Sequence, residues 1–307
     1  MFDEEQSQQA WLIISQISIM ALEHGNVRMV QLSMLGSVLA NTLLVRKQKL
    51  SRRLIGLTSK VVGCCFLIGG LKHKESVFNA TFASTASSLM TAASASLLVP
   101  VALFGTHCNA NSNCEDSVKM LSRVIAIILL FLFAVYLNFR LNSHTSLFEG
   151  NASHENQEHE ESEQTCSVAL TLVTLLMCML LTAVVSFFLI GASNSIVESS
   201  YISGRFVGLV LLPLVAEGSE RIKAVGVAYN DRMDSALDFT IGRSVHIALF
   251  VTPLLVLLGW AMRTREPMTF HFESFEAVTF FFGVLLVNDL IRDAKSNYLE
   301  GAICLAT

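Results

Sequence analysis

Residues 206–260 constrain the fold of this chain more than any other stretch, because they form two long apolar runs joined by the short polar hinge 229–234. The first run is interrupted by the polar cluster 216–221, which contains Glu217 and Glu220. Apolar residues flank the cluster on both sides over roughly one bilayer thickness. Acidic side chains at such a depth are costly to bury, and they therefore indicate a functional site.

The second run, residues 241–260, carries Arg243, Ser244 and His246 at a depth that matches the acidic cluster. Two neighbouring spans with polar midpoints that face each other predict an ion site. His246 is a candidate proton relay within it, and the alternative is a hydrogen-bonded contact between helices.

The composition supports a membrane protein. Of the 307 residues, 52% are hydrophobic and 15% are charged, whereas soluble chains carry about 25% charged residues. The apolar residues lie in continuous runs rather than in helical stripes, so we expect an all-α polytopic bundle in a lipid bilayer. The sequence contains no nucleotide-binding motif, and we expect neither a cofactor nor a nucleic-acid partner.

An acidic segment divides the chain into two halves. Residues 148–166 contain six glutamates and separate a first half, 1–147, from a second half, 167–307. The segment is expected to be a solvated linker, either a plain flexible connection or a low-affinity calcium- or proton-sensing element. The basic residues Lys72, Arg140 and Arg292 indicate that the linker faces the cytoplasm if the spans alternate.

The predicted apolar segments recur in both halves. In the first half they cover residues 11–22, 27–45, 61–71, 79–104 and 120–137, with a basic insertion at about 46–60. In the second half they cover residues 167–192, 206–228, 236–262 and 275–291, and a further span begins at 299. Residues 35–45 align with 241–251, and such paired elements place a transporter's substrate site between repeats.

Five stretches of the chain match a known family, and they are residues 30–41, 69–75, 228–234, 248–253 and 295–301. In these stretches the chain resembles the vacuolar calcium/proton exchangers of fungi and plants, within the cation/calcium exchanger superfamily. The resemblance implies a sodium/calcium-exchanger-like bundle of two inverted repeats. It also implies antiport of calcium, the transported substrate, against protons, by alternating access across the vacuolar membrane.

The resemblance also implies which residues line the site. Each repeat of the family carries a G-N-x-x-E type motif whose glutamate coordinates calcium, and Glu220 keeps that acid while Glu217 stands at the asparagine. Ser244 is an expected ligand from the next span, where Arg243 replaces a serine and His246 a glutamine.

Ser37 and Asn41 are the oxygen donors expected from the first repeat. Small polar residues in spans are more often packing contacts, and this is the alternative for Ser37.

This chain departs from the family in the first repeat, where residues 10–14 should carry the motif but contain no acid. The first repeat and the last span are also expected to be incomplete. The alternative function is therefore a transport-inactive or truncated relative that only binds cations or partners.

The charged residues near the site have two interpretations of their own. Arg243 is either a permanent cation that occupies the calcium position, or it snorkels or pairs with Asp238. The acids are either ligands or members of a charge ladder, in which Glu217 pairs with Arg221 and Glu220 with Lys223.

Overall fold

The computed structural model describes eleven parts of the chain, which are residues 15–23, 25–42, 61–72, 76–107, 114–140, 176–177, 179–189, 191–192, 204–230, 232–262 and 268–306. Three segments singled out in the sequence lie outside these residues. They are the first-repeat motif position 10–14, the basic insertion 46–60 and the acidic linker 148–166.

The described part of the first half contains five helical segments and one short strand. After helical residues 15–23 come α2 (Val27–Thr42), α4 (Val61–Lys72), β1 (Ser76–Val77), α5 (Ala80–His107) and α6 (Cys114–Asn138).

The second half contains two composite helices in which α-helical and π-helical turns alternate. The first joins α9 (Gly204–Phe206), the π-helix η3 (Val207–Leu211) and α10 (Leu212–Tyr229). The second joins α11 (Met233–Leu237), the π-helix η4 (Asp238–Gly242), α12 (Arg243–His246), the π-helix η5 (Ile247–Val251) and α13 (Thr252–Ala261). The chain then forms α14 (Ser274–Ile291), β2 (Lys295–Ser296) and α15 (Tyr298–Ala306).

Four of the described helices are long and apolar enough to cross a membrane. They cover residues 80–105, 116–138, 233–261 and 274–291. The spans predicted at 236–262 and 275–291 therefore agree with the structure to within a few residues. The prediction of a polytopic all-α membrane protein is confirmed.

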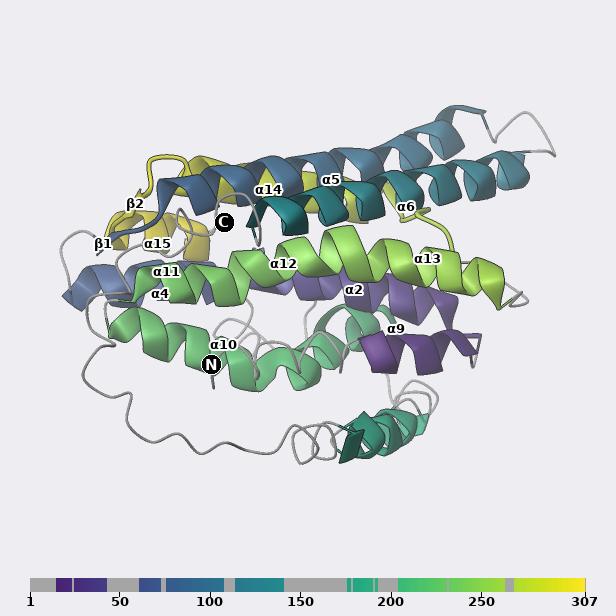
Figure 1. Cartoon of the computed structure of the whole chain (residues 1–307), viewed down its shortest axis with the longest axis horizontal. Helices are drawn as coiled ribbons and strands as arrows, with labels where there is room; N and C mark the ends of the chain where they lie inside the picture. Colours follow the sequence, from purple (N-terminus) through teal and green to yellow (C-terminus); the bar gives the residue numbers. More distant parts are fainter. Residues whose placement is uncertain are drawn as a thin grey trace.

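The helices form an elongated bundle in which the two halves of the chain interleave. In Figure 1, α5, α6 and α14 run along one side, α2 and α11 to α13 run through the middle, and α10 lies on the other side. Helix α2 of the first half packs against η3, α10 and α14 of the second half. Its residues from Val30 to Leu39 are all buried, so α2 is a central element of the core.

Another helix approaches the backbone of α2 closely at Gly36. A Cβ atom at this position would collide with the carbonyl oxygen of Leu209 in η3. Pro213, four residues after Leu209, has no N–H group to donate to that carbonyl. Glycine at position 36 therefore lets the backbone of α2 lie directly against a helical turn that a proline has opened.

The small residues of α5 serve helix packing, as expected from its sequence. The side-chain amide of Asn288 on α14 donates hydrogen bonds to the carbonyl oxygen of Ser87 (3.3 Å) and to Oγ1 of Thr91 (2.5 Å). The first turn of α5 is capped by Asn79, whose Oδ1 accepts from the N–H groups of Thr81 and Phe82.

A small β-bridge ties the two halves together at one end of the bundle. Strands β1 and β2 pair antiparallel, with Ser76 opposite Ser296 and Val77 opposite Lys295 (Figure 1). The ends of α4 and α14 that carry Lys72 and Arg292 therefore lie at the same end of the molecule.

Candidate functional site

Two proline-opened helices form the frame of the candidate site. Pro213 lies at the start of α10, directly after η3, and Pro253 lies at the start of α13, directly after η5. A proline inside a helix removes one hydrogen bond and clashes with the carbonyl four residues before it, so the preceding turn widens. Widened turns of this kind occur frequently at functional sites. The acidic cluster on α10 follows η3, whereas Arg243 on α12 lies between the π-helical turns η4 and η5.

Glu217 is the most deeply buried acid among the described residues, with only 1% of its surface exposed. Its Oε2 accepts a 2.7 Å hydrogen bond from Nη2 of Arg221, one helical turn later on α10. Its other oxygen, Oε1, has no hydrogen-bond partner among the described residues. The charge-ladder interpretation is therefore correct for this pair, although one carboxylate oxygen remains available.

Glu220 pairs with a cation from a different helix. Its carboxylate forms an ion pair with the guanidinium group of Arg243 on α12, and both side chains are nearly buried. Glu217 also acts electrostatically on Arg243. Asp238 pairs with Arg140, two residues after the end of α6, over 3.2 Å. The structure thus supports the interpretation that places Arg243 among the acids.

The three predicted oxygen donors lie in different surroundings. Ser37 on α2 is fully buried, and its Oγ has no hydrogen-bond partner within the described parts of the chain. Ser244 is also fully buried, but its hydroxyl donates to the carbonyl oxygen of Thr240 one turn earlier (2.9 Å). Asn41 lies on α2 four residues after Ser37, and its side chain lies outside the described part of the structure.

His246 lies against aromatic rings of α6. Its ring meets Phe133 edge-on at a centroid distance of 5.3 Å and Tyr136 at 6.4 Å. These contacts favour the interhelical packing role. Tyr136 in turn accepts a hydrogen bond from Arg140, so an extended polar chain runs from Asp238 through Arg140 to the rim of this aromatic cluster.

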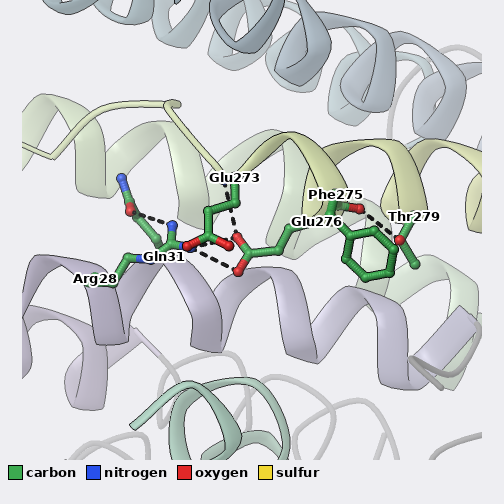
Figure 2. A network of polar contacts seen from close by, with 6 residues as sticks. All are labelled: Arg28, Gln31, Glu273, Phe275, Glu276 and Thr279. Carbon is green, nitrogen blue, oxygen red and sulfur yellow. Dashed lines mark hydrogen bonds and ion pairs between the residues drawn. The ribbon is translucent and has the colours of Figure 1, made fainter. Parts of the chain in front are cut away.

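A second polar cluster, which the sequence did not single out, joins the two halves of the chain at the start of α2 and α14. Nη2 of Arg28 donates to both carboxylate oxygens of Glu276, at 2.8 Å each, and lies 3.4 Å from Oε1 of Glu273. Figure 2 shows the three side chains converging between the two helices. We call this cluster the Arg28 clamp.

The Arg28 clamp also organises the chain before α14. Glu273 and Glu276 form a reciprocal capping box at the start of that helix. Gln31, buried on α2, donates to the carbonyl oxygen of Thr269 over 2.8 Å. His271 in the same segment lies against the ring of Phe104. Burial and the nearby charge of Arg28 lower the pKa of His271 below its ordinary value.

One signal for the clamp is visible in the sequence. Arg28 stands at the first turn of one apolar helix and Glu276 at the first turn of another, so each charge marks a membrane boundary. Nothing local in either stretch indicates that these two ends meet.

Among the described residues, no group of three or more His, Cys, Asp or Glu side chains is arranged to hold a metal ion. The acids on α10 are paired with arginines instead. A cation can therefore bind them only together with hydroxyl or carbonyl oxygens, such as those of Ser37 and of the proline-opened turns.

Known proteins with similar sequences identify the family to which this chain belongs. The sodium/calcium exchanger protein family matches residues 170–307. Over 300 residues, the chain is 32% identical to a Ca(2+)/H(+) antiporter of Aphanothece halophytica, covering 95% of this chain and 75% of that protein. The chain belongs to the calcium/proton exchanger family.

Other members of this exchanger family are similar over nearly the whole chain. A vacuolar calcium ion transporter of Schizosaccharomyces pombe is 35% identical over 293 residues, and a vacuolar cation/proton exchanger of Oryza sativa is 33% identical. Each match covers 94% of this chain, but the chain spans only 65% and 62% of those relatives' lengths.

Solved exchanger structures share the fold. The native structure of YfkE matches 96% of this chain and 77% of its own with a TM-score of 0.72 and 26% identity. The H+/Ca2+ exchanger CAX matches 97% of this chain and 69% of its own with a TM-score of 0.62 and 14% identity. The predicted exchanger-like fold is therefore confirmed.

Proposed function

We propose that this chain is a calcium/proton antiporter of the vacuolar membrane, which exchanges the two ions at the carboxylates of Glu217 and Glu220. The observation that carries the proposal is the burial of both acids on a proline-opened helix of an exchanger fold. The family relatives named above, two of them vacuolar, support the substrate and the membrane. The chain covers about two thirds of the vacuolar relatives, so the activity of the whole protein is part of the proposal.

The chemistry of the acids suits antiport. Calcium takes six to eight oxygen ligands, including carboxylates, carbonyls and hydroxyls. Oε1 of Glu217 and Oγ of Ser37, which have no hydrogen-bond partner among the described residues, are two buried oxygens able to contribute. A buried carboxylate that loses its cation takes up a proton more readily than one in water, because burial disfavours the charged form. Calcium and protons therefore compete for the same groups.

The way the halves interleave supports alternating access. Helix α2 of the first half lies directly against η3 and α10 of the second half, with Gly36 at the contact. A small movement of one half against the other exposes the acids first to one side of the membrane and then to the other. The basic residues at the β1–β2 end support a cytoplasmic location for that end, and for the acidic linker 148–166.

The proposal is tested by the coupling of the two ion fluxes. Purified protein is reconstituted into proteoliposomes with a pH-sensitive dye inside, and an inward calcium gradient is applied. We expect proton efflux that disappears in Glu220→Gln and in Glu217→Gln, while Asp116→Asn, an exposed acid at the start of α6, leaves it intact. Calcium entry without proton movement would contradict antiport.

A second candidate function is a calcium-binding relative that does not transport. The observation that favours it is the pairing of both buried acids with arginines, Glu217 with Arg221 and Glu220 with Arg243. In that case calcium binds to the purified protein, but neither ion crosses the membrane of the same proteoliposomes.

A further inference from the structure

The four charged side chains at the centre of the site neutralise one another. Glu217 and Glu220 carry two negative charges, and Arg221 and Arg243 carry two positive charges. Both arginines are buried, with 6% and 7% of their surface exposed. A calcium ion that enters this group adds two positive charges to a set that is already balanced.

The two arginines are not equivalent. Arg221 lies on α10 itself, four residues after the acid that it binds, so the pair moves as one helix. Arg243 approaches Glu220 from α12, across the interface between the two site helices. A guanidinium group keeps its charge at any pH a cell reaches. The Arg243 side chain is therefore a permanent cation presented to the acid from outside its own helix, as a bound ion would be.

We propose that Arg243 is a tethered cation that occupies the carboxylate of Glu220 in place of calcium, and that calcium binds Glu220 only when Arg243 leaves it. The inference rests on the proposed function, because it concerns the same carboxylate. It makes Arg243 the residue that sets the calcium concentration at which the site fills.

The physical reason is repulsion between cations in a medium of low dielectric constant. Water does not screen charges at a buried site, so a divalent ion and a guanidinium group cannot share one carboxylate at close range. The apparent affinity for calcium is then the intrinsic affinity multiplied by the fraction of molecules in which the Glu220–Arg243 pair is broken. Removing the guanidinium group removes that factor.

The test is equilibrium binding of radioactive calcium to the purified full chain in detergent. We expect Arg243→Ser to bind calcium about tenfold or more tightly than the unmodified chain. Arg243→Lys keeps the charge and is expected to bind as weakly as the unmodified chain. Arg140→Ser is the matched control, because it removes an arginine from a different ion pair, with Asp238, and is expected to change nothing.

A small soluble cation gives a second readout that a merely structural arginine would not produce. Methylguanidinium added to Arg243→Ser is expected to fill the vacated position and to compete with calcium, whereas it has no effect on the unmodified chain. If Arg243→Ser does not give a folded protein, Arg243→Gln supplies the neutral variant with a longer side chain.

The outcomes separate this inference from the proposed function. Tighter calcium binding by Arg243→Ser without any transport upholds the tethered cation and refutes antiport. Calcium binding by the unmodified chain that is as tight as in the neutral variants, and that Glu220→Gln abolishes, overturns the inference while leaving antiport standing.

Discussion

Arg28 and Glu276 lie 248 positions apart in the sequence, yet one guanidinium nitrogen donates to both oxygens of the carboxylate at 2.8 Å. The contact joins the first turn of α2 to the first turn of α14 and thereby connects the two halves of the chain. Glu276 is mostly buried, whereas the Arg28 side chain is 39% exposed. The pair is therefore partly shielded from water.

The first prediction concerns the strength of this pair. A double-mutant cycle with Arg28→Ala and Glu276→Ala should give a coupling free energy of about 1–2 kcal/mol, because charge-assisted hydrogen bonds exceed neutral ones. Thermal denaturation in detergent measures it. The exposed pair Lys119–Asp116, at 3.3 Å on α6, is the control and should give about 0–0.5 kcal/mol. Equal coupling energies in the two pairs would contradict the clamp.

The second prediction concerns Gly36. Replacing it with alanine should lower the free energy of unfolding by about 1–3 kcal/mol, because the added Cβ collides with the carbonyl oxygen of Leu209. Gly226 on α10 has no atom of the described residues within 4 Å of a Cβ and is the control. Gly226→Ala should leave stability unchanged or raise it by about 0.5–1 kcal/mol. Melting curves that rank the two variants the other way would contradict the close α2–η3 contact.

Sequence reasoning located the spans because long apolar runs are a strong local signal. It predicted 79–104 and 275–291, and the structure has helices at Ala80–His107 and Ser274–Ile291, both long and apolar enough to cross a membrane. At the predicted span 206–228 the composite helix runs from 204 to 229, but its apolar part covers only Val207–Gly218. Sequence reasoning placed the start of α6 at residue 120, whereas the helix begins at Cys114. The first turns of α6 are polar, and acids are favoured at a helix N-terminus, so hydropathy alone cannot show that the helix has already begun.

The candidate site was only partly predictable for a different reason. The Glu217–Arg221 pair follows from helical spacing, which any sequence displays. The partners of Arg243 and Asp238 do not follow from helical spacing, because each side chain pairs with a residue from a distant part of the chain. Tertiary packing decides which charged residue each one meets. The Arg28 clamp was missed altogether, since its two ends lie in opposite halves of the chain.

The third prediction concerns the pH dependence of stability at the Arg28 clamp. The pKa of His271 is lowered in the folded protein by burial and by the charge of Arg28. Below about pH 6.5 the unfolded chain therefore binds more protons at this residue than the folded chain does, and stability falls as the pH falls. Above that pH the contribution of His271 is constant.

Melting temperatures measured across this range check the effect. The unmodified chain should lose more stability than His271→Gln as the pH falls below about 6.5. In Arg28→Gln, which removes one of the two causes, the loss specific to His271 should be smaller. Parallel pH profiles for the unmodified chain and His271→Gln would contradict the prediction.

The fourth prediction concerns the most deeply buried ion pair. Glu217→Gln leaves Arg221 charged and without its carboxylate, so it should destabilise the protein by about 3–5 kcal/mol. Glu217→Gln combined with Arg221→Met should recover most of that loss, because no unpaired charge remains. Denaturation of the two variants in detergent decides the matter, and a double variant less stable than the single one would refute it.

The central claim is that the buried acids of α10 exchange calcium for protons, and the most direct measurement is calcium uptake driven by a proton gradient. Proteoliposomes containing the full chain are loaded with acid inside, placed in neutral buffer with radioactive calcium outside, and compared with Glu220→Gln. The account predicts uptake that collapses when the proton gradient is dissipated and that is absent in Glu220→Gln. Uptake that persists in Glu220→Gln, or its absence from folded and inserted protein both with and without Arg243→Ser, would contradict it.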